Sequence, residues 1–323
     1  MKLLVTGGSG FIGRHLIEHM AAQGHEIANL DIAKPADESH AAYFQPCNIM
    51  DGAAVKACFQ RFQPEAVVHL AARTDPAPGV PVEIYYAPIT GGTQNILDAA
   101  RSTPSVARVV VTSTQLVWRP ECPAVGSEEY RPFADYGRAK MEMEKMTKAA
   151  NLSCIWTIIR PVLIWGPWHI FYRDTLFRAI QKGYYFHPSG QSAVLALGYV
   201  KNIARQIGKL LQADSALVNQ KTLYVGDGLF SLVDWINGYS QELTGHNIRY
   251  LPRSLIRLLA LFGDLYQTVT KRRFVMDSVR YRNMTDDYTA PLEPTLQLLG
   301  PPEISLQQGI KETVAWARKY PGR

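Results

Sequence analysis

Short apolar runs alternate with helix-favouring segments along the first half of the chain, and this alternation predicts strands followed by helices. The runs that predict buried strands are residues 2–6, 26–30, 66–69, 107–112 and 155–160. The segments that predict helices are residues 11–23, 90–102 and 136–150. Such alternation predicts an α/β fold in which helices cover both faces of a parallel sheet. We expect the functional site beyond the carboxyl ends of the strands, after Thr6, Asp31, His69 and Thr112.

Three glycines interrupt the pattern between the first strand and the first helix. Gly7, Gly10 and Gly13 allow a tight turn, let the backbone approach a pyrophosphate at the helix N-terminus and let the helix pack closely on the sheet. Asp31 ends the second strand, where a carboxylate can accept hydrogen bonds from an adenosine ribose and repels a 2′-phosphate. The pattern predicts a dinucleotide site that favours NAD over NADP. The alternative is a glycine-rich turn without a ligand.

A tyrosine and a lysine stand four residues apart at the start of a later predicted helix. Tyr136 and Lys140 would project from the same side of that helix. A nearby ammonium group favours the phenolate and lowers the pKa of a tyrosine, which could then exchange a proton with a substrate hydroxyl. The chain contains 16 tyrosines, so the spacing alone is a weak signal and an ordinary surface pair is the alternative.

Several sequence segments occur in the order expected of one known family. They are TGGSGFIG at 6–13, VVHLAA at 67–72, VVVTSTQLVW at 109–118, YGRAK at 136–140, IIRPVLIWGPW at 158–168 and LGPPEISLQQGIKETVAW at 299–316. Together they resemble the extended short-chain dehydrogenases/reductases of the NAD-dependent epimerase/dehydratase family, over almost the full length. The resemblance implies a Rossmann-type doubly wound parallel sheet with a smaller C-terminal substrate domain.

The same resemblance implies domain boundaries. Residues 1–163 would form the NAD-binding domain, and residues 164–323 would mainly bind the substrate. Residues 197–227 would return to the first domain, where the segments 199–211 and 221–226 are expected to rejoin the sheet.

The resemblance also assigns roles to individual residues. It implies that Thr114 hydrogen-bonds the reacting oxygen, with Ser113 as the alternative hydroxyl. Tyr136 would move the proton, and Lys140 would also hold the nicotinamide ribose. The residues implied to bind the cofactor are Gly7, Gly10, Phe11, Ile12, Gly13, Asp31, Ile32, Asn48, Ile49, Leu70, Ala71, Ala72, Tyr136, Lys140, Pro161 and Leu163.

Departures from the family pattern bear on the substrate. Gln115 and Leu116 replace the acidic pair that follows the catalytic threonine in dehydratases, so we do not expect dehydration. Leu163 and Leu195 stand where sugar-nucleotide members often carry Asn and Arg, and YVKN at 199–202 is similar to the 3β-hydroxysteroid dehydrogenase branch. Our first expectation is 4-epimerisation or 4-keto reduction of a nucleotide-activated sugar. The second is a hydroxysteroid or hydroxy-lipid dehydrogenase, and the third is a catalytically silent NAD-binding regulatory protein.

Positive charge is concentrated late in the chain. The net charge is +6, and residues 249–282 carry eight basic against two acidic side chains, which is also +6. A solvated face is the simplest explanation; a substrate diphosphate or an anionic membrane surface are the alternatives. Within this region, residues 254–265 are apolar but too few to span a bilayer, so we expect a core helix or, as the alternative, a helix lying on a membrane. No nucleic-acid-binding motif accompanies the charge.

Other signals are weaker. His15, Glu18 and His19 read as an inverted zinc-protease motif, but we interpret the histidines as a polar helix face and expect no metal. The cysteines at 47, 58, 122 and 154 lack CxxC spacing, and the N-terminus lacks the long apolar core of a signal peptide. We therefore expect a cytoplasmic enzyme, a homodimer, with a small-molecule substrate and no nucleic-acid partner.

Overall fold

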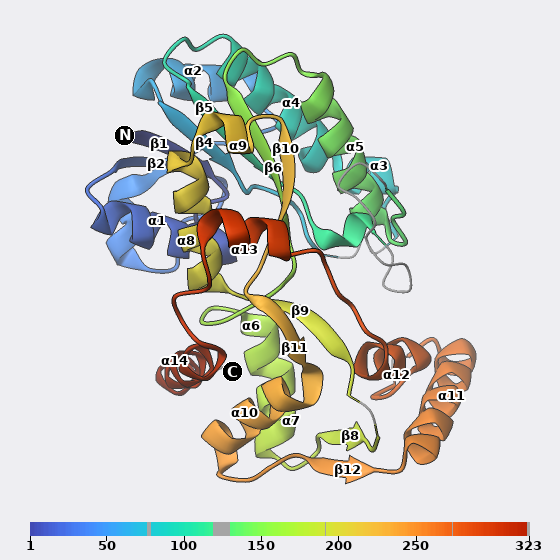
Figure 1. Ribbon diagram of the computed structural model, residues 1–323. Coiled ribbons are helices and arrows are strands. Elements are labelled where there is room, and N and C mark those ends of the chain that lie inside the picture. The colour runs from blue at the N-terminus through green and yellow to red at the C-terminus, as the bar shows by residue number, and fades with distance from the viewer. Residues whose placement is uncertain (76–78, 119–129, 191, 273, 322–323) are drawn as a thin grey trace. The chain divides into compact units, whose positions relative to one another are not determined.

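The computed structural model describes residues 1–75, 79–118, 130–190, 192–272 and 274–321 (Figure 1). The chain forms two compact units. The first comprises Met1–Ile164, Gly198–Asp227 and Ala290–Glu303, and the second comprises Trp165–Leu197, Gly228–Thr289 and Ile304–Arg323. The roles expected for the two domains stay predictions.

The first unit is built on a sheet whose paired strands all run parallel. Among the described residues it has seven strands in the order β10-β6-β5-β4-β1-β2-β3. Their bounds are β1 Lys2–Thr6, β2 Glu26–Asp31, β3 Phe44–Pro46, β4 Ala66–His69, β5 Arg108–Thr112, β6 Ile155–Pro161 and β10 Lys221–Val225. The strand order reverses at β1, and Thr6 pairs with Leu30 on one side and His69 on the other. The predicted doubly wound α/β fold is confirmed.

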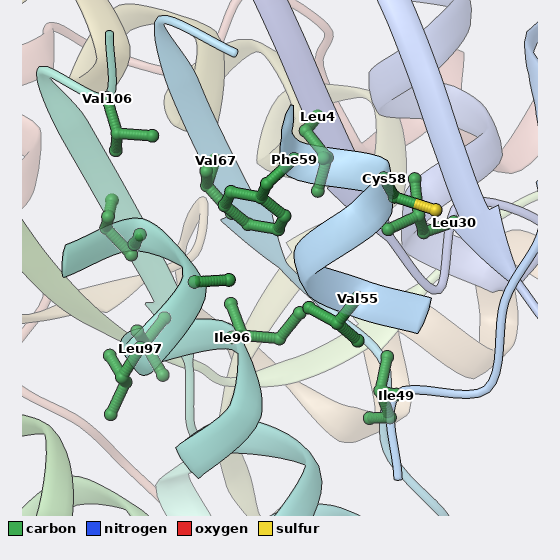
Figure 2. Close-up of a cluster of buried hydrophobic side chains, with 14 of the residues drawn as sticks. Leu4, Leu30, Ile49, Val55, Cys58, Phe59, Val67, Ile96, Leu97 and Val106 are labelled. Atoms are coloured by element: carbon green, nitrogen blue, oxygen red, sulfur yellow. The ribbon is translucent and has the colours of Figure 1, made fainter. Parts of the chain in front are cut away.

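Helices cover both faces of this sheet (Figure 1). They are α1 Phe11–Ala22, η1 Glu38–Tyr43, α2 Gly52–Phe62, α3 Val82–Tyr85, α4 Ala87–Arg101, η2 Gln115–Val117, α5 Asp135–Ala149, α8 Val200–Gln212, α9 Ser215–Val218 and α13 Glu293–Leu299. Successive side chains of a strand point to opposite faces, so Leu4 of β1 packs in one core with α2 and α4, which Figure 2 shows. Leu3 and Val5 pack in a second core with α1 and α8.

The two segments expected to rejoin the sheet do so differently. Residues 221–225 add strand β10 beside β6. Residues 200–212 instead form helix α8, which covers the sheet and packs on α1, so they add no strand. The pattern of buried residues explains this result, because Ile203, Ile207, Leu210 and Leu211 recur at helical spacing and all lie in the core.

The second unit combines helices with short strands. Its elements are α6 Ile170–Tyr172, η3 Arg173–Phe177, α7 Arg178–Gln181, β8 Phe186–Pro188, β9 Val194–Tyr199, β11 Gly228–Ser231, α10 Leu232–Thr244, β12 Arg249–Leu251, α11 Arg253–Thr270, α12 Ser278–Thr285 and α14 Leu306–Lys319. Two strands, β7 Leu163–Trp165 and β9, contain residues of both units. Trp165, Trp235 and Tyr239 form an aromatic core with ring centroids 5.5–6.1 Å apart.

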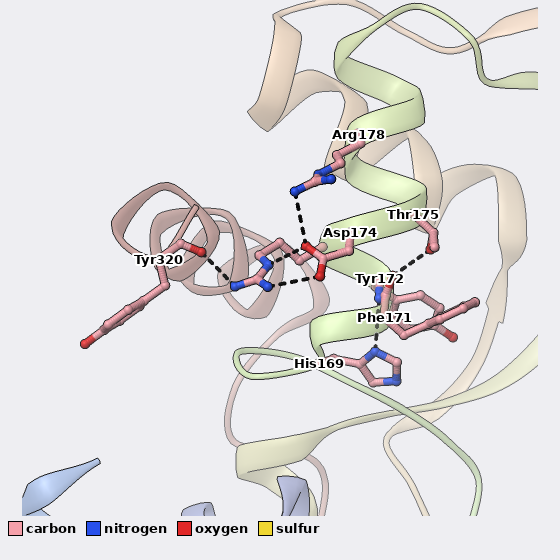
Figure 3. Close-up of polar contacts among 8 residues, drawn as sticks. His169, Phe171, Tyr172, Asp174, Thr175, Arg178 and Tyr320 are labelled. Carbon is pink, nitrogen blue, oxygen red and sulfur yellow. Dashed lines mark hydrogen bonds and ion pairs between the residues drawn. The ribbon is translucent and has the colours of Figure 1, made fainter. Parts of the chain in front are cut away.

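A cluster of charged side chains connects the end of α14 to the helical segment 170–181 within this unit (Figure 3). The Arg173 guanidinium donates to both carboxylate oxygens of Asp174, at 2.8 and 3.1 Å, and to the carbonyl oxygen of Tyr320 at 2.9 Å. Arg178 lies 3.7 Å from the same carboxylate. These contacts join the helical segment 170–181 to the end of α14.

Helix α11 corrects one expectation from the sequence. It buries only the residues of one narrow side, Ile256, Ala260 and Gly263, and exposes most of its large apolar side chains. The expected core helix is therefore wrong. In the described part of the chain, no helix is long and apolar enough to cross a membrane.

Candidate functional site

The glycine turn lies between β1 and α1 and has almost no room for side chains. Gly7 has a φ of +71°, and a methyl group there would lie 2.7 Å from the Cα of Ala71. A methyl group at Gly13 would collide with the carbonyl oxygen of Gly7. The amide of Gly10 closes the turn by donating to that same carbonyl at 3.0 Å. Glycine is required here by its missing Cβ, and the turn leads into a helix N-terminus that has no side-chain cap at Gly10.

Asp31 lies beside the turn, where the sequence predicted it. One carboxylate oxygen accepts a hydrogen bond from the backbone amide of Ser9 at 3.0 Å, and the other accepts one from Ala33 at 3.0 Å. Asn29 also contacts the turn, because its side-chain amide donates a hydrogen bond to the Ser9 hydroxyl at 3.1 Å. The Asp31 carboxylate is therefore fixed at the end of β2, in contact with the glycine turn.

The next strand ends at the same edge. Leu70, Ala71 and Ala72 follow β4, and the Ala71 amide donates to the Thr6 hydroxyl at 3.2 Å. The Thr6 hydroxyl also contacts Nδ1 of His69 at 2.6 Å. Burial lowers the pKa of His69 to about 3, so the ring is neutral. This buried contact ties β1 to β4 at the switch point.

Other residues implied to bind the cofactor differ in how far they are exposed to solvent. Asn48 is exposed, and the neighbouring Cys47 amide donates to the carbonyl oxygen of Asp31 at 3.0 Å. The side chain of Ile49 is buried in the core, and its carbonyl oxygen accepts a hydrogen bond from the Asn95 side chain of α4 at 2.8 Å. Ile32 is exposed. Pro161 ends β6, the strand next to β5, and Leu163 starts β7, which belongs to a separate three-stranded sheet with β9 and β11.

The residues predicted to be catalytic come from two neighbouring elements. Thr114 follows β5 and caps η2, and its hydroxyl oxygen accepts a hydrogen bond from the Leu116 amide at 3.2 Å. Tyr136 and Lys140 lie on successive turns of α5, and the Lys140 amine is 6.0 Å from the centre of the Tyr136 ring. The amine donates to the carbonyl oxygen of Thr112 at 2.6 Å. Lys140 therefore joins α5 to the end of β5.

A glycine lets the two elements meet. A methyl group at Gly137 would collide with the carbonyl oxygen of Leu116, two residues after Thr114. Ser113, the alternative hydroxyl, is buried, and its Oγ has no hydrogen-bond partner among the described residues. The structure thus brings the segment directly after Ser113 and Thr114 against the start of α5.

The electrostatics of the tyrosine differ from the sequence-based expectation. Burial raises the pKa of Tyr136 above its usual value, and the neighbouring Tyr86 adds to the effect. Burial lowers the pKa of Lys140 to about 7, although the carboxylate of Glu144 acts in the opposite direction. The expected lowering of the tyrosine pKa is therefore wrong for this structure, because the lysine is itself buried, partly neutral near pH 7 and bonded to Thr112. At neutral pH the phenol carries its proton.

Comparison with known proteins identifies the family. A sequence model described as "NAD dependent epimerase/dehydratase family" matches residues 3–226. The chain belongs to this family. The family expected from the sequence is thereby confirmed.

Two relatives and one solved structure illustrate what this epimerase-family chain is similar to. A UDP-glucose 4-epimerase of Streptomyces lividans is 32% identical over 45% of this chain and 46% of its own length. A 3 beta-hydroxysteroid dehydrogenase/Delta 5-->4-isomerase of Mycobacterium tuberculosis is 29% identical over 62% of this chain and 58% of its own. The chain thus matches less than two thirds of the length of these relatives. The crystal structure of a Thermus thermophilus UDP-glucose 4-epimerase has the same fold, with a TM-score of 0.74 at 20% identity over 99% of this chain and 100% of that one.

The family motif around Arg160 includes an ion pair that sequence reasoning missed. Arg160 of β6 donates to both oxygens of the Glu144 carboxylate, at 2.9 and 2.8 Å, and both side chains are fully buried. Tyr224 accepts from the same guanidinium at 3.1 Å, and Tyr130 donates to the carboxylate at 2.9 Å. Glu144 lies one turn beyond Lys140, so this pair holds the helix that carries Tyr136. In the sequence, this ion pair is visible only as a glutamate four residues after Lys140. That spacing is common on solvent-exposed helices, so it does not indicate a buried pair.

The histidine motif in α1 is built differently from the expected polar face. His15 is buried, and its Nδ1 contacts Glu18 at 3.3 Å. His40 of η1 contacts the other oxygen of the same carboxylate at 3.4 Å. These contacts link α1 to η1, so the reading of His15 as part of an exposed face is wrong. Among the residues that the structure describes, no group of His, Cys, Asp or Glu is arranged to hold a metal ion.

The stability of the ligand-free protein should rise with pH above neutrality. Below about pH 7 Lys140 is protonated in both the folded and the unfolded protein. The cost of burying its charge then lowers the free energy of unfolding in full. Between about pH 7 and its ordinary pKa of 10.5 the unfolded chain binds more protons, so the free energy of unfolding increases with pH. Urea unfolding from pH 6 to 9.5 should show a contribution of up to about 1.4 kcal/mol per pH unit that is absent in Lys140→Met. The exposed Lys145→Met variant should keep the wild-type slope, and equal slopes in all three proteins would contradict the prediction.

Gly137→Ala should damage activity more than stability. The added methyl group must push η2 and Thr114 away from α5, and misplacement of a reacting group by about 1 Å can cost about 10²-fold in rate. Steady-state assays should show this loss in kcat, whereas Arg138→Ala, at an exposed position of the same helix, should leave kcat nearly unchanged. Normal turnover of Gly137→Ala would mean that the contact does not position Thr114.

Proposed function

We propose that this protein transfers a hydride between NAD and a carbon that alternates between a secondary alcohol and a ketone. One observation carries the proposal: Tyr136 and Lys140 share one face of α5, and Gly137 holds that helix against the segment of Thr114. The three side chains are those that the family resemblance implies for catalysis.

The residues around the glycine turn fit a dinucleotide. Gly7 and Gly13 leave a cradle that a Cβ would fill, and the uncapped start of α1 provides the positive end of a helix dipole for a pyrophosphate. Asp31 would accept hydrogen bonds from the adenosine ribose, and Lys140 would donate to the nicotinamide ribose. The other contacts proposed are those of Phe11, Ile12, Ile32, Asn48, Ile49, Leu70, Ala71, Ala72, Pro161 and Leu163. When bound, NAD supplies or accepts the hydride.

The side chains supply the proton and hold the oxygen. In the direction of reduction, the Tyr136 phenol gives its proton to the substrate oxygen as the carbon accepts the hydride, and solvent then restores the proton. Thr114, or Ser113, donates a hydrogen bond to that oxygen. Burial keeps the phenol protonated at neutral pH, which suits it as a proton donor to a ketone.

A nucleotide-activated sugar is the first substrate class we propose, converted by 4-epimerisation or 4-keto reduction. Membership of an epimerase/dehydratase family and the similarity to the Streptomyces lividans UDP-glucose 4-epimerase support this choice. Gln115, which is buried, and Leu116 follow Thr114, so no acid is available there to protonate a leaving hydroxyl. Dehydration is therefore not proposed.

A hydroxysteroid or hydroxy-lipid is the second candidate, and specific observations favour it. The apolar side chains of Leu163 and Leu195 stand at positions where sugar-nucleotide relatives carry polar groups, and Leu195 is buried. The similarity to the mycobacterial steroid dehydrogenase and the exposed apolar face of α11 point in the same direction. The cytoplasmic location and the homodimer stay predictions.

One experiment separates these possibilities. Melting temperatures would be measured with NAD alone and with NAD plus UDP-, GDP- and dTDP-sugars or hydroxysterols, because a ligand of the native state raises the melting temperature. Turnover would be followed with every compound that produces a shift, as NADH formation for oxidation, NADH consumption for reduction and interconversion of the two C4 epimers for epimerisation. A shift with a sugar nucleotide supports the first class, and a shift with sterols alone supports the second. Binding of NAD with no turnover of any compound would favour a regulatory protein, and no shift with NAD would refute the proposal.

A further inference from the structure

Helix α11 presents a continuous apolar face to solvent. Leu258, Phe262, Leu265 and Val269 recur at i, i+4, i+7 and i+11 and are 64, 53, 62 and 73% exposed. Other exposed apolar residues widen the same face: Leu255, Leu259 and Leu261. Isolated exposed leucines are common on protein surfaces, but a stripe of this length marks a surface that contacts something apolar.

The opposite side of α11 packs against other residues of the protein. Ile256, Ala260 and Gly263 are buried, and a methyl group at Gly263 would collide with the carbonyl oxygen of Met276. Asp264 accepts hydrogen bonds from the amide and hydroxyl of Ser278, at the start of α12. The exposed stripe therefore belongs to a helix that is fixed in place by its other side.

Exposed basic side chains are concentrated in the chain segment that contains the stripe. Those that the structure describes as exposed are Arg249, Arg253, Arg257, Lys271, Arg272, Arg280 and Arg282; Arg273 lies outside the described residues. The two acids of this region are engaged in holding the structure, since Asp264 binds Ser278 and Asp277 caps α12. Residues 249–282 carry the whole net charge of +6, so the rest of the chain is neutral. The net positive charge is thus concentrated in the segment that carries the apolar face.

We propose that the exposed face of α11 forms a docking surface for an anionic lipid bilayer. The helix would lie in the interfacial plane, with the apolar stripe at the boundary between headgroups and acyl chains. The arginines and lysines would reach anionic headgroups, since their long side chains can cross apolar surface before presenting a charge.

Charge complementarity decides between a bilayer and a second copy of the chain. Two copies meeting through α11 would bring their basic side chains together, which is unfavourable. An anionic bilayer instead offers an apolar interior and negative charge at the same surface. The surface is independent of hydride transfer, so the proposal does not rest on the proposed function.

Vesicle co-sedimentation of the full chain tests the proposal. The wild-type protein should bind vesicles of phosphatidylcholine with 30% phosphatidylserine and bind pure phosphatidylcholine much more weakly. Phe262→Glu and Leu265→Glu should each lower the partition coefficient by at least about tenfold. The double variant Arg257→Glu/Arg272→Glu should lower binding to the anionic vesicles by a similar factor. The matched control is Leu217→Glu on α9, which is 54% exposed and should bind as the wild type does.

Circular dichroism and melting temperature would establish that each variant is folded. The proposal is overturned if the wild-type protein binds neither vesicle, if Leu265→Glu binds as well as the wild type, or if Leu217→Glu causes an equal loss. It is also overturned if the wild-type protein is an oligomer that ignores vesicles and that Leu265→Glu converts to a monomer in light scattering, because the face would then be a subunit contact. Turnover of the best substrate in vesicle-free solution tests the proposed function separately.

Discussion

Tyr136→Phe is expected to lower turnover by about 10² to 10⁴-fold while NAD still binds. The substitution removes only the phenolic oxygen, which the proposed reaction uses to exchange a proton with the substrate oxygen. The ring remains, so its packing against Tyr86, with ring centroids 6.0 Å apart, is kept. The measurement is kcat with the best substrate from the thermal-shift series, together with the dissociation constant of NAD.

The control for this result is Tyr184→Phe, which makes the same change at an exposed tyrosine of the second unit and should leave kcat unaltered. Thr114→Val and Ser113→Ala extend the test to the neighbouring hydroxyls. The larger loss should identify the one that hydrogen-bonds the reacting oxygen. If Tyr136→Phe turns over normally, the proposed proton transfer is refuted.

Glu144→Gln is expected to lower the free energy of unfolding by about 3–5 kcal/mol. The substitution leaves the fully buried guanidinium of Arg160 without its compensating charge, and removing one partner of a buried ion pair has costs of this size. The helix that carries Tyr136 and Lys140 also loses its charged contact with β6. The measurement is equilibrium unfolding in urea at pH 8.

Glu142→Gln is the matched control, on the same helix. Its carboxylate pairs with Lys145 at 2.9 Å, but both side chains are about half exposed, so the loss should not exceed about 1 kcal/mol. The double variant Glu144→Leu/Arg160→Met replaces both charges by apolar groups and should recover much of the stability lost in the single variant. Equal losses for Glu144→Gln and Glu142→Gln would show that the buried pair contributes little.

The electrostatics of the site depend on the same pair. The Glu144 carboxylate raises the pKa of Lys140 and so opposes the effect of burial. Glu144→Gln should therefore lower the pKa of Lys140 further and shift the onset of the pH-dependent stability to lower pH. The ion pair thus connects the stability of α5 to the protonation of the amine that contacts the end of β5.

The sequence predicted those features that short segments of chain decide. One local feature comprises the strand at residues 2–6, Gly7, Gly10 and Gly13 after it and the acid at the end of β2. A side chain at any of these glycines would come close to the backbone of the turn or of the residue Ala71 that follows β4. Residues 66–69 are a strand as expected, and the helix expected at 136–150 spans Asp135–Ala149. The prediction that Thr6, Asp31, His69 and Thr112 end strands of one parallel sheet also holds.

The errors concern contacts between distant segments. The sequence predicts His15 at a polar helix face, but His15 is buried, and His40 of a distant segment contacts the same Glu18 carboxylate. Residues 254–265 were expected in a core, yet the large apolar side chains lie on the side of α11 that nothing in the described chain covers. Hydrophobic spacing identifies an apolar face of a helix, but it does not say whether the fold supplies a partner for that face.

The sequence by itself determined the α/β fold, the glycine turn and the residues from which the candidate site is built. These follow from the period of apolar residues and from backbone conformations that only glycine adopts easily, which are properties of short segments. The tertiary structure alone decided the burial of Lys140, the raised pKa of Tyr136, the pairing of Glu144 with Arg160 and the exposure of α11. Each of these depends on how much water is excluded by segments remote in sequence, and desolvation is a property of the packed molecule.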